Sequence, residues 1–210
     1  LIARPFFLTS NTVGIVPVGV SLPSPTPPDE GYRYADRAHI EPLINEHTRA
    51  ILVTNPGNPT GVVLSPEEMR LMADIAKEPN LVLVCDEVYR EVVYGGEPLA
   101  SMAQFDDAAE NVVVVDSISK RFSACGARVG ILVSRNQELM AQALKICQGR
   151  LCAATLDQLG AAALYGVGSD YCSAVREEYH KRRDTCMGGL AKIPGVVCEC
   201  PKGAFYIMAK

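Results

Sequence analysis

Two short apolar runs in this 210-residue chain are each followed at once by polar residues. Leu81–Cys85 leads directly into Asp86, and Asn111–Val115 leads into the segment Asp-Ser-Ile-Ser-Lys at 116–120. Continuous apolar runs of this length are typical of strands that are covered on both faces, as in parallel sheets. Because the carboxyl ends of parallel strands meet at one edge, the sequence predicts an α/β sheet with its functional site at that edge.

Other segments extend this sheet and place helices between its strands. Arg49–Thr54 is a further apolar run, and we expect Val129–Val133 to be a third buried strand. Ser65 caps a helix that continues to about Lys77, because proline and two acidic residues follow it in the first turn. Further helical patterns occupy Ile40–Asn45, Asn136 to beyond Leu164 with a glycine interruption, and Ser169 to Arg183.

These elements predict two domains. Residues 1–165 are expected to form a three-layer α/β/α domain with a mostly parallel sheet, ending in an interdomain helix. Residues 166–210 carry a charged helical stretch followed by short apolar runs at 195–200 and 203–207, which predicts the start of a smaller α+β domain.

Composition narrows the class of protein. A chain with 48% hydrophobic residues can bury a core, and its net charge of −4 predicts no nucleic-acid partner. No run approaches the roughly 18 apolar residues of a membrane span. The eight cysteines match neither zinc-ligand spacing nor a secreted disulfide scaffold, so we expect reduced thiols, no metal site and a cytoplasmic protein.

Lys120 is the candidate nucleophile. It follows a buried strand, where poor solvation favours the neutral amine that condenses with an aldehyde, although a surface lysine fits the same pattern. Eight residues later, the guanidinium fork of Arg128 could hold a phosphate together with the hydroxyl of Ser117 or Ser119.

Three more polar residues could reach the same sheet edge. Asp86 needs a cation or a ring N–H at the end of a buried strand, or else it caps a helix. Tyr89 reaches the same pocket if the chain turns helically after Asp86. Asn58 offers an amide from the turn Asn55–Gly61, although this segment could also be a turn without a functional role. Together an amine, an anion, hydrogen-bond donors and an arginine are what pyridoxal phosphate requires.

With these residues the chain resembles the fold type I pyridoxal-phosphate enzymes, and within them the class I/II aminotransferases. The resemblance covers essentially the whole chain, and residues 201–206 are similar to the start of the family's small-domain strand. The motifs that carry it are Asn55-Pro-Gly-Asn-Pro-Thr-Gly61, Asp86-Glu-Val-Tyr89, and Ser117-Ile-Ser-Lys120 followed by Gly126-Ala-Arg128-Val-Gly130.

The resemblance implies a role for each of these side chains. Lys120 would bind the cofactor aldehyde, and would then move the proton at the α-carbon of the substrate. Asp86 would stay ionised and keep the pyridine nitrogen protonated. Asn58 and Tyr89 would donate hydrogen bonds to the phenolic oxygen of the cofactor.

The resemblance also implies which residues bind the phosphate of the cofactor. Ser117 and Arg128 are implied as its ligands. Ser119 and Arg121 have neighbours that match the motif, and Arg121 is expected either to face solvent or to bind a substrate group.

The implied activity is transfer of an amino group between an L-amino acid and a 2-oxo acid. Aspartate and 2-oxoglutarate are favoured, because residues 119–151 look most like bacterial aspartate or broad amino-acid aminotransferases. Family members are homodimers. Other family parts should lie before Leu1 and beyond Lys210, so we expect a central fragment of about half the usual chain that is inactive alone.

Two alternatives stay open at this point. A lyase or decarboxylase could use the same cofactor contacts, since the outcome depends on which substrate bond lies perpendicular to the ring. An aminotransferase-like sensor domain of a transcription regulator is the other, and it would need a DNA-binding domain upstream.

Overall fold

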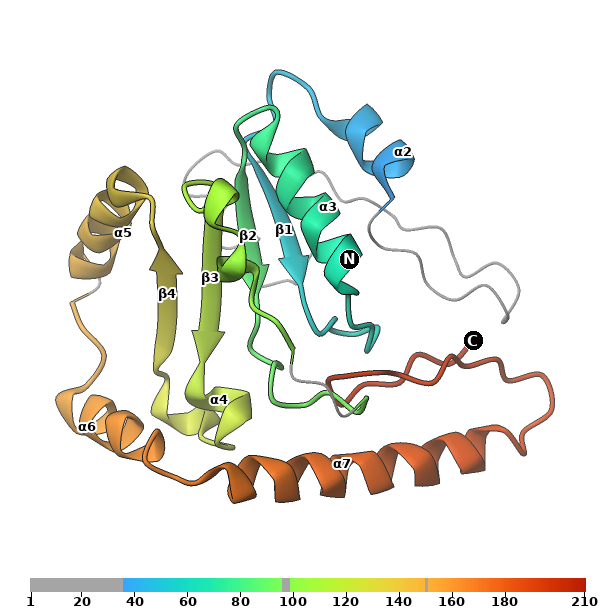
Figure 1. Cartoon of the computed structure of the whole chain (residues 1–210). Helices are drawn as coiled ribbons and strands as arrows, with labels where there is room; N and C mark the ends of the chain where they lie inside the picture. The colour runs from blue at the N-terminus through green and yellow to red at the C-terminus, as the bar shows by residue number, and fades with distance from the viewer. Residues whose placement is uncertain (1–35, 96–98, 150) are drawn as a thin grey trace.

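The computed structural model of the chain describes residues 36–95, 99–149 and 151–210 (Figure 1). The first 35 residues of the predicted larger domain therefore lie outside the described residues. At the start of the described part, α2 (Arg37–Ile40) continues into the 3-10 helix η1 (Glu41–Leu43), as the helical pattern at Ile40–Asn45 partly predicted.

Among the described residues, four strands form one sheet in the order β1-β2-β3-β4. They are β1 (Ala50–Thr54), β2 (Val82–Asp86), β3 (Val112–Ser117) and β4 (Gly130–Ser134), and each lies within two residues of its predicted position. The pairs β1–β2 and β2–β3 are parallel, whereas β3 and β4 are antiparallel. The mostly parallel α/β sheet that the sequence predicted is confirmed.

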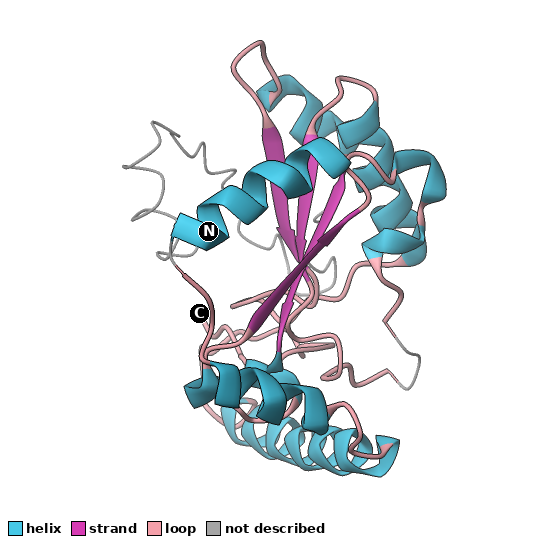
Figure 2. Ribbon diagram, turned by 90° about the vertical axis from the view of Figure 1, so that its left-hand side faces the viewer, coloured by secondary structure: helices cyan, strands magenta, loops and turns pink. Residues whose placement is uncertain are grey.

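The helix α3 (Pro66–Lys77) crosses from β1 to β2 and covers one face of the sheet. Ser65 accepts a hydrogen bond from Glu68 N, and the Glu68 side chain accepts one from Ser65 N, which forms a complete capping box. Its buried face, including Met69 and Met72, packs with sheet residues such as Leu83 to form the core. Figure 2 shows α3 and α5 (Gln137–Gly149) on different sides of the sheet.

Two sequence expectations need correction. Val129–Val133 was expected to be a buried strand, but Leu132 and Val133 of β4 are 41% and 50% exposed in the described structure. Apolar composition alone does not show whether anything covers a strand. The helical pattern after Asn136 is two helices, α5 and α6 (Thr155–Leu164), rather than one interrupted helix.

The carboxyl ends of β1, β2 and β3 point toward the same side of the molecule. There β3 leads into the short helix α4 (Ile118–Arg121) and the 3-10 helix η4 (Cys125–Ala127). The long helix α7 (Ser169–Leu190) passes below this edge, with the C-terminal segment lying between α7 and the sheet (Figure 1). The 3-10 helices η2 (Met102–Gln104) and η3 (Asp106–Ala108) precede β3.

Candidate active site

The register of the sheet brings the ends of the two motif strands together. Asp86 is the last residue of β2 and pairs with Val115 of β3, two residues before Ser117. On the other side, Asn55 N donates to Asp86 O at 2.9 Å, so the turn that contains Asn58 starts at the same edge. The predicted gathering of these segments at one sheet edge is what the backbone shows.

Lys120 lies in α4, whose N-cap is Ser117. The residue is half-buried, and its Nζ lies 5.9 Å from the ring centroid of Tyr89 and 5.6 Å from that of Phe205. In the part of the chain that the structure describes, no group forms a hydrogen bond or an ion pair with this amine. The amine therefore sits against two aromatic rings with its hydrogen-bonding capacity unused by those residues.

The Asp86 carboxylate also has spare capacity. Its Oδ1 accepts a hydrogen bond from Val88 N at 3.1 Å, which is the capping role that the sequence left as an alternative. Burial raises the pKa of Asp86, and the Val88 N–H opposes this only in part. No cation among the described residues forms an ion pair with Asp86, so a bound N–H group would relieve the cost of its burial.

Tyr89 and Asn58 meet at a third residue, Tyr206. The Tyr89 hydroxyl lies 2.5 Å from the Tyr206 hydroxyl, and Asn58 Nδ2 donates to the same Tyr206 oxygen at 3.5 Å. Tyr89 is only 2% exposed, and burial, followed by the hydrogen bond with Tyr206, raises its pKa. The Tyr89 phenol is therefore neutral at ordinary pH and available as a donor.

The predicted phosphate ligands are close in register but do not touch one another. Ser117 pairs with Gly130, two residues after Arg128, and Ser117 Oγ accepts from Ser119 N at 3.2 Å. Arg128 is exposed, has a left-handed backbone with φ of 57°, and donates from Nη1 to Cys125 O at 3.0 Å. The structure thus places Arg128 beside the Ser117 strand end without aiming its guanidinium at Ser117.

Arg121 does not face solvent but pairs with Asp116, which corrects one of the two expectations for this residue. Its Nη2 lies 2.6 Å from Asp116 Oδ2, and the two side chains are 14% and 10% exposed. Asp116 and Arg121 flank Ser117 and Lys120 in the sequence, so this buried ion pair closes the turn that carries them. Burial raises the pKa of Asp116, and Arg121 counteracts that rise.

The C-terminal segment is fixed to the Asn55–Gly61 turn by its backbone. Gly61 O accepts hydrogen bonds from Lys202 N at 2.8 Å and from Gly203 N at 2.9 Å. A Cβ on Gly203 would lie 2.8 Å from Pro56 Cβ, so only glycine permits this approach. This contact carries Phe205 and Tyr206 to the Lys120 edge.

Sequence reasoning did not assign Phe205, Tyr206 or Glu87 a place at this edge. Glu87 is 2% exposed, and its Oε1 accepts from Met102 N at 2.7 Å and Ser101 Oγ at 3.0 Å. These two hydrogen bonds hold residues 101 and 102 against Glu87, which follows β2. No local pattern reveals these partners, since Tyr89 and Tyr206 are 117 positions apart.

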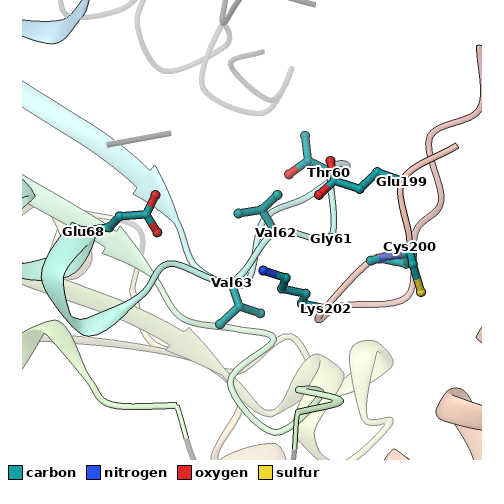
Figure 3. Close-up of a pocket in the computed structure, with 9 residues that line it drawn as sticks. Thr60, Gly61, Val62, Val63, Glu68, Glu199, Cys200 and Lys202 are labelled. Atoms are coloured by element: carbon teal, nitrogen blue, oxygen red, sulfur yellow. The ribbon is translucent and has the colours of Figure 1, made fainter. Parts of the chain in front are cut away.

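Two cavities in the described part of the chain are lined by residues other than Lys120. One of about 110 Å³ is lined by Glu68, by residues 60–63 and by residues 199–202, and Figure 3 shows Glu199 and Lys202 beside Thr60–Val63. The other, of about 350 Å³, is lined by Glu41, Ile44, Ile75, Glu78 and Pro79. We assign the chemistry to the open Lys120 edge, because Lys120, Asp86 and Tyr89 gather there.

The described residues hold neither a metal-binding cluster nor a membrane-spanning helix. They contain no group of three or more His, Cys, Asp and Glu side chains that could hold a metal ion. None of the helices in the described ranges is long and apolar enough to cross a membrane. All eight cysteines, which fall within these ranges, are free thiols.

Comparison with known proteins identifies the family. The sequence profile described as "Aminotransferase class I and II" matches residues 27–210. An aspartate aminotransferase from Bacillus subtilis is 33% identical over 80% of this chain and 43% of its own length. A putative aminotransferase from the same bacterium is 33% identical over 98% of this chain and 53% of its own. The crystal structure of an aromatic aminotransferase from Pyrococcus horikoshii superposes with a TM-score of 0.78 at 28% identity, covering 85% of this chain and 48% of that one.

The chain therefore belongs to the class I and II aminotransferases, a family that depends on pyridoxal phosphate. It spans about half the length of the curated relatives that it matches. The residues at the Lys120 edge fit this cofactor chemically. They offer an amine without a described polar partner, a half-buried carboxylate without a described cation, and phenol and hydroxyl donors.

Proposed function

We propose that the protein to which this chain belongs transfers an amino group between an L-amino acid and a 2-oxo acid. We favour aspartate and 2-oxoglutarate as the substrate pair. The single observation that carries the proposal is the gathering of Lys120, Asp86 and Tyr89 at one sheet edge in a chain of the aminotransferase family. The resemblance to aspartate aminotransferases supports the choice of substrates.

When bound, pyridoxal phosphate supplies an aldehyde that condenses with amines and a ring that accepts the electron pair released at the substrate α-carbon. Lys120 provides the amine that holds the aldehyde carbon. When not bound to the cofactor, the Lys120 amine would serve as the base and then the acid for the proton at the substrate α-carbon. The Tyr89 and Phe205 rings lie beside this amine, with centroids 5.9 and 5.6 Å from Nζ.

The other residues hold and tune the ring. Asp86, whose burial disfavours an isolated negative charge, is stabilised by pairing with the ring N–H and so keeps a proton on that nitrogen. The Tyr89 hydroxyl donates a hydrogen bond to the phenolic oxygen of the cofactor ring. Ser117 and Arg128 hold the phosphate, which requires Arg128 to turn its exposed guanidinium from Cys125 O toward the Ser117 strand end.

The test is product analysis with the full-length protein and pyridoxal phosphate. Incubation with aspartate and 2-oxoglutarate should yield glutamate and oxaloacetate in equal amounts, and Lys120→Ala should yield neither. With serine in place of aspartate, release of ammonia and pyruvate without a new amino acid would replace the proposal by a lyase. Absence of any turnover with a panel of amino acids would contradict it.

We propose three further properties of the whole protein. The boundary between the larger and the smaller domain falls between residues 165 and 166, which is supported by the break between α6 and α7. The protein is a homodimer and works in the cytoplasm. We also propose that the 210 residues do not catalyse transamination alone, because relatives are about twice as long.

A further inference from the structure

Tyr206 occupies a place at the candidate site for which the family resemblance gave no role. It lies in the C-terminal hairpin, defined here as residues 197–210, in which Val197 and Lys210 exchange both backbone hydrogen bonds at 2.9 Å. The hairpin approaches the site from the smaller domain (Figure 1). Tyr206 itself is half-buried.

The position of Tyr206 is fixed from two directions. On one side, Gly61 O accepts from Lys202 N and Gly203 N, and on the other Val92 O accepts from Ala204 N at 2.9 Å. The Phe205 ring stacks on Tyr179 of α7, with centroids 4.9 Å apart. A side chain held this firmly keeps its hydroxyl in one place at little further cost in entropy.

The direction of the hydrogen bonds follows from the groups themselves. The Asn58 amide nitrogen can only donate, so the Tyr206 oxygen accepts in their long 3.5 Å contact. The single proton of Tyr206 is then free to point to the Tyr89 oxygen, 2.5 Å away. Tyr89 in turn keeps its own proton for a third group. The three residues therefore form a relay that runs from Asn58 through Tyr206 to Tyr89.

We propose that Tyr206 is a positioning residue that strengthens Tyr89 as the hydrogen-bond donor to the phenolic oxygen of pyridoxal phosphate. The inference rests on the proposed function. A hydroxyl that accepts one hydrogen bond becomes a better donor in the next, so aligned hydrogen bonds reinforce one another. Asn58 has a second amide proton, so it can serve the relay and the phenolic oxygen at once.

The relay predicts an observable shift. Donors to the phenolic oxygen spread its negative charge, which eases loss of the proton from the Lys120 nitrogen attached to the cofactor. Weaker donation by Tyr89 holds that proton to higher pH. The midpoint of the pH-dependent absorbance change of the bound cofactor should therefore rise when Tyr206 loses its hydroxyl.

The experiment is a spectrophotometric pH titration of the full-length protein loaded with pyridoxal phosphate. Tyr206→Phe should raise the midpoint by about 0.3 to 0.5 of a pH unit, the size expected if one neighbour strengthens a charged hydrogen bond by a fifth. Tyr89→Phe should raise it more. The double variant should match Tyr89→Phe, because Tyr206 acts through Tyr89.

Two further variants make the titration decisive. Tyr179→Phe removes a hydroxyl from the same aromatic cluster outside the relay, and should leave the midpoint unchanged. Tyr206→3-fluorotyrosine keeps the shape of the side chain but makes the phenol more acidic, so it should lower the midpoint. This opposite shift tests the relay even if Tyr206→Phe fails to fold.

The outcomes separate this inference from the proposed function. A wild-type protein without a reducible cofactor band at Lys120 would contradict the proposed function. A normal band with no shift in Tyr206→Phe would overturn the relay alone. Additive shifts in the double variant would also overturn it, because Tyr206 would then act independently of Tyr89.

Discussion

Replacement of Arg121 by leucine tests the ion pair that closes the Lys120 turn. The Arg121 and Asp116 side chains are 14% and 10% exposed, and the charged atoms lie 2.6 Å apart. Leucine fills much of the space but leaves the Asp116 carboxylate buried without its cation. Breaking such a pair from one side costs about 3 kcal/mol, so we expect the unfolding free energy of the full-length protein to fall by about that amount.

The second replacement, Asp116→Asn in the Arg121→Leu background, should recover about 1 kcal/mol or more, because it removes the unpaired charge. The loss in Arg121→Leu should also shrink at low pH. Burial without Arg121 raises the pKa of Asp116 in the folded protein, so the penalty applies above that pKa and disappears as the carboxylate is protonated.

Urea unfolding followed by circular dichroism measures these differences. Arg135→Leu is the matched control, because Arg135 and its partner Asp106 are 63% and 79% exposed and such pairs contribute little. If Arg121→Leu lost no more stability than Arg135→Leu, the assignment of Arg121 as a buried structural partner would be wrong.

Two other predictions concern the same edge. Gly203→Ala should lower the unfolding free energy by about 1–3 kcal/mol, because the new methyl group would lie 2.8 Å from both Pro56 Cβ and Val63 Cγ2. Gly188→Ala, which meets open space in α7, should show no such loss in the same urea assay. The affinity for pyridoxal phosphate should fall as pH drops through the raised pKa of Asp86, since only the ionised carboxylate pairs with the ring N–H. Equilibrium titrations of wild type and Asp86→Asn give the dissociation constant for pyridoxal phosphate from about pH 4 to 8. The two constants should differ by about tenfold or more at the upper end of this range and converge at the lower end. A constant ratio between them across the range would refute this role of Asp86.

The parts of the fold that sequence predicts well are those specified locally. Leu81–Cys85 and Val112–Val115 are apolar throughout, which fits β2 and β3 at the centre of the sheet. Ser65, Pro66 and Glu68 define the start of α3 by groups within one turn of each other. The exposure of β4 was not predictable in this way, because burial depends on what lies beside a strand.

In the candidate site, too, locally specified features were predictable and those that depend on other parts of the structure were not. Asp86 and Ser117 end their strands and Lys120 lies three residues after Ser117, so their common edge follows from the parallel order of β2 and β3. The partners of Tyr89 and Arg121 were not predictable. The first comes from a segment 117 positions away, and the second depends on how the turn at residues 116–121 orients two charged side chains.

The most direct test of the central claim is chemical mapping of the cofactor amine. The full-length protein is loaded with pyridoxal phosphate, reduced with borohydride, digested, and analysed by mass spectrometry. The account predicts one phosphopyridoxyl group on the peptide that contains Lys120, and none in Lys120→Ala. Equal labelling of the variant, or labelling of another lysine such as Lys202 in the wild type, would contradict it.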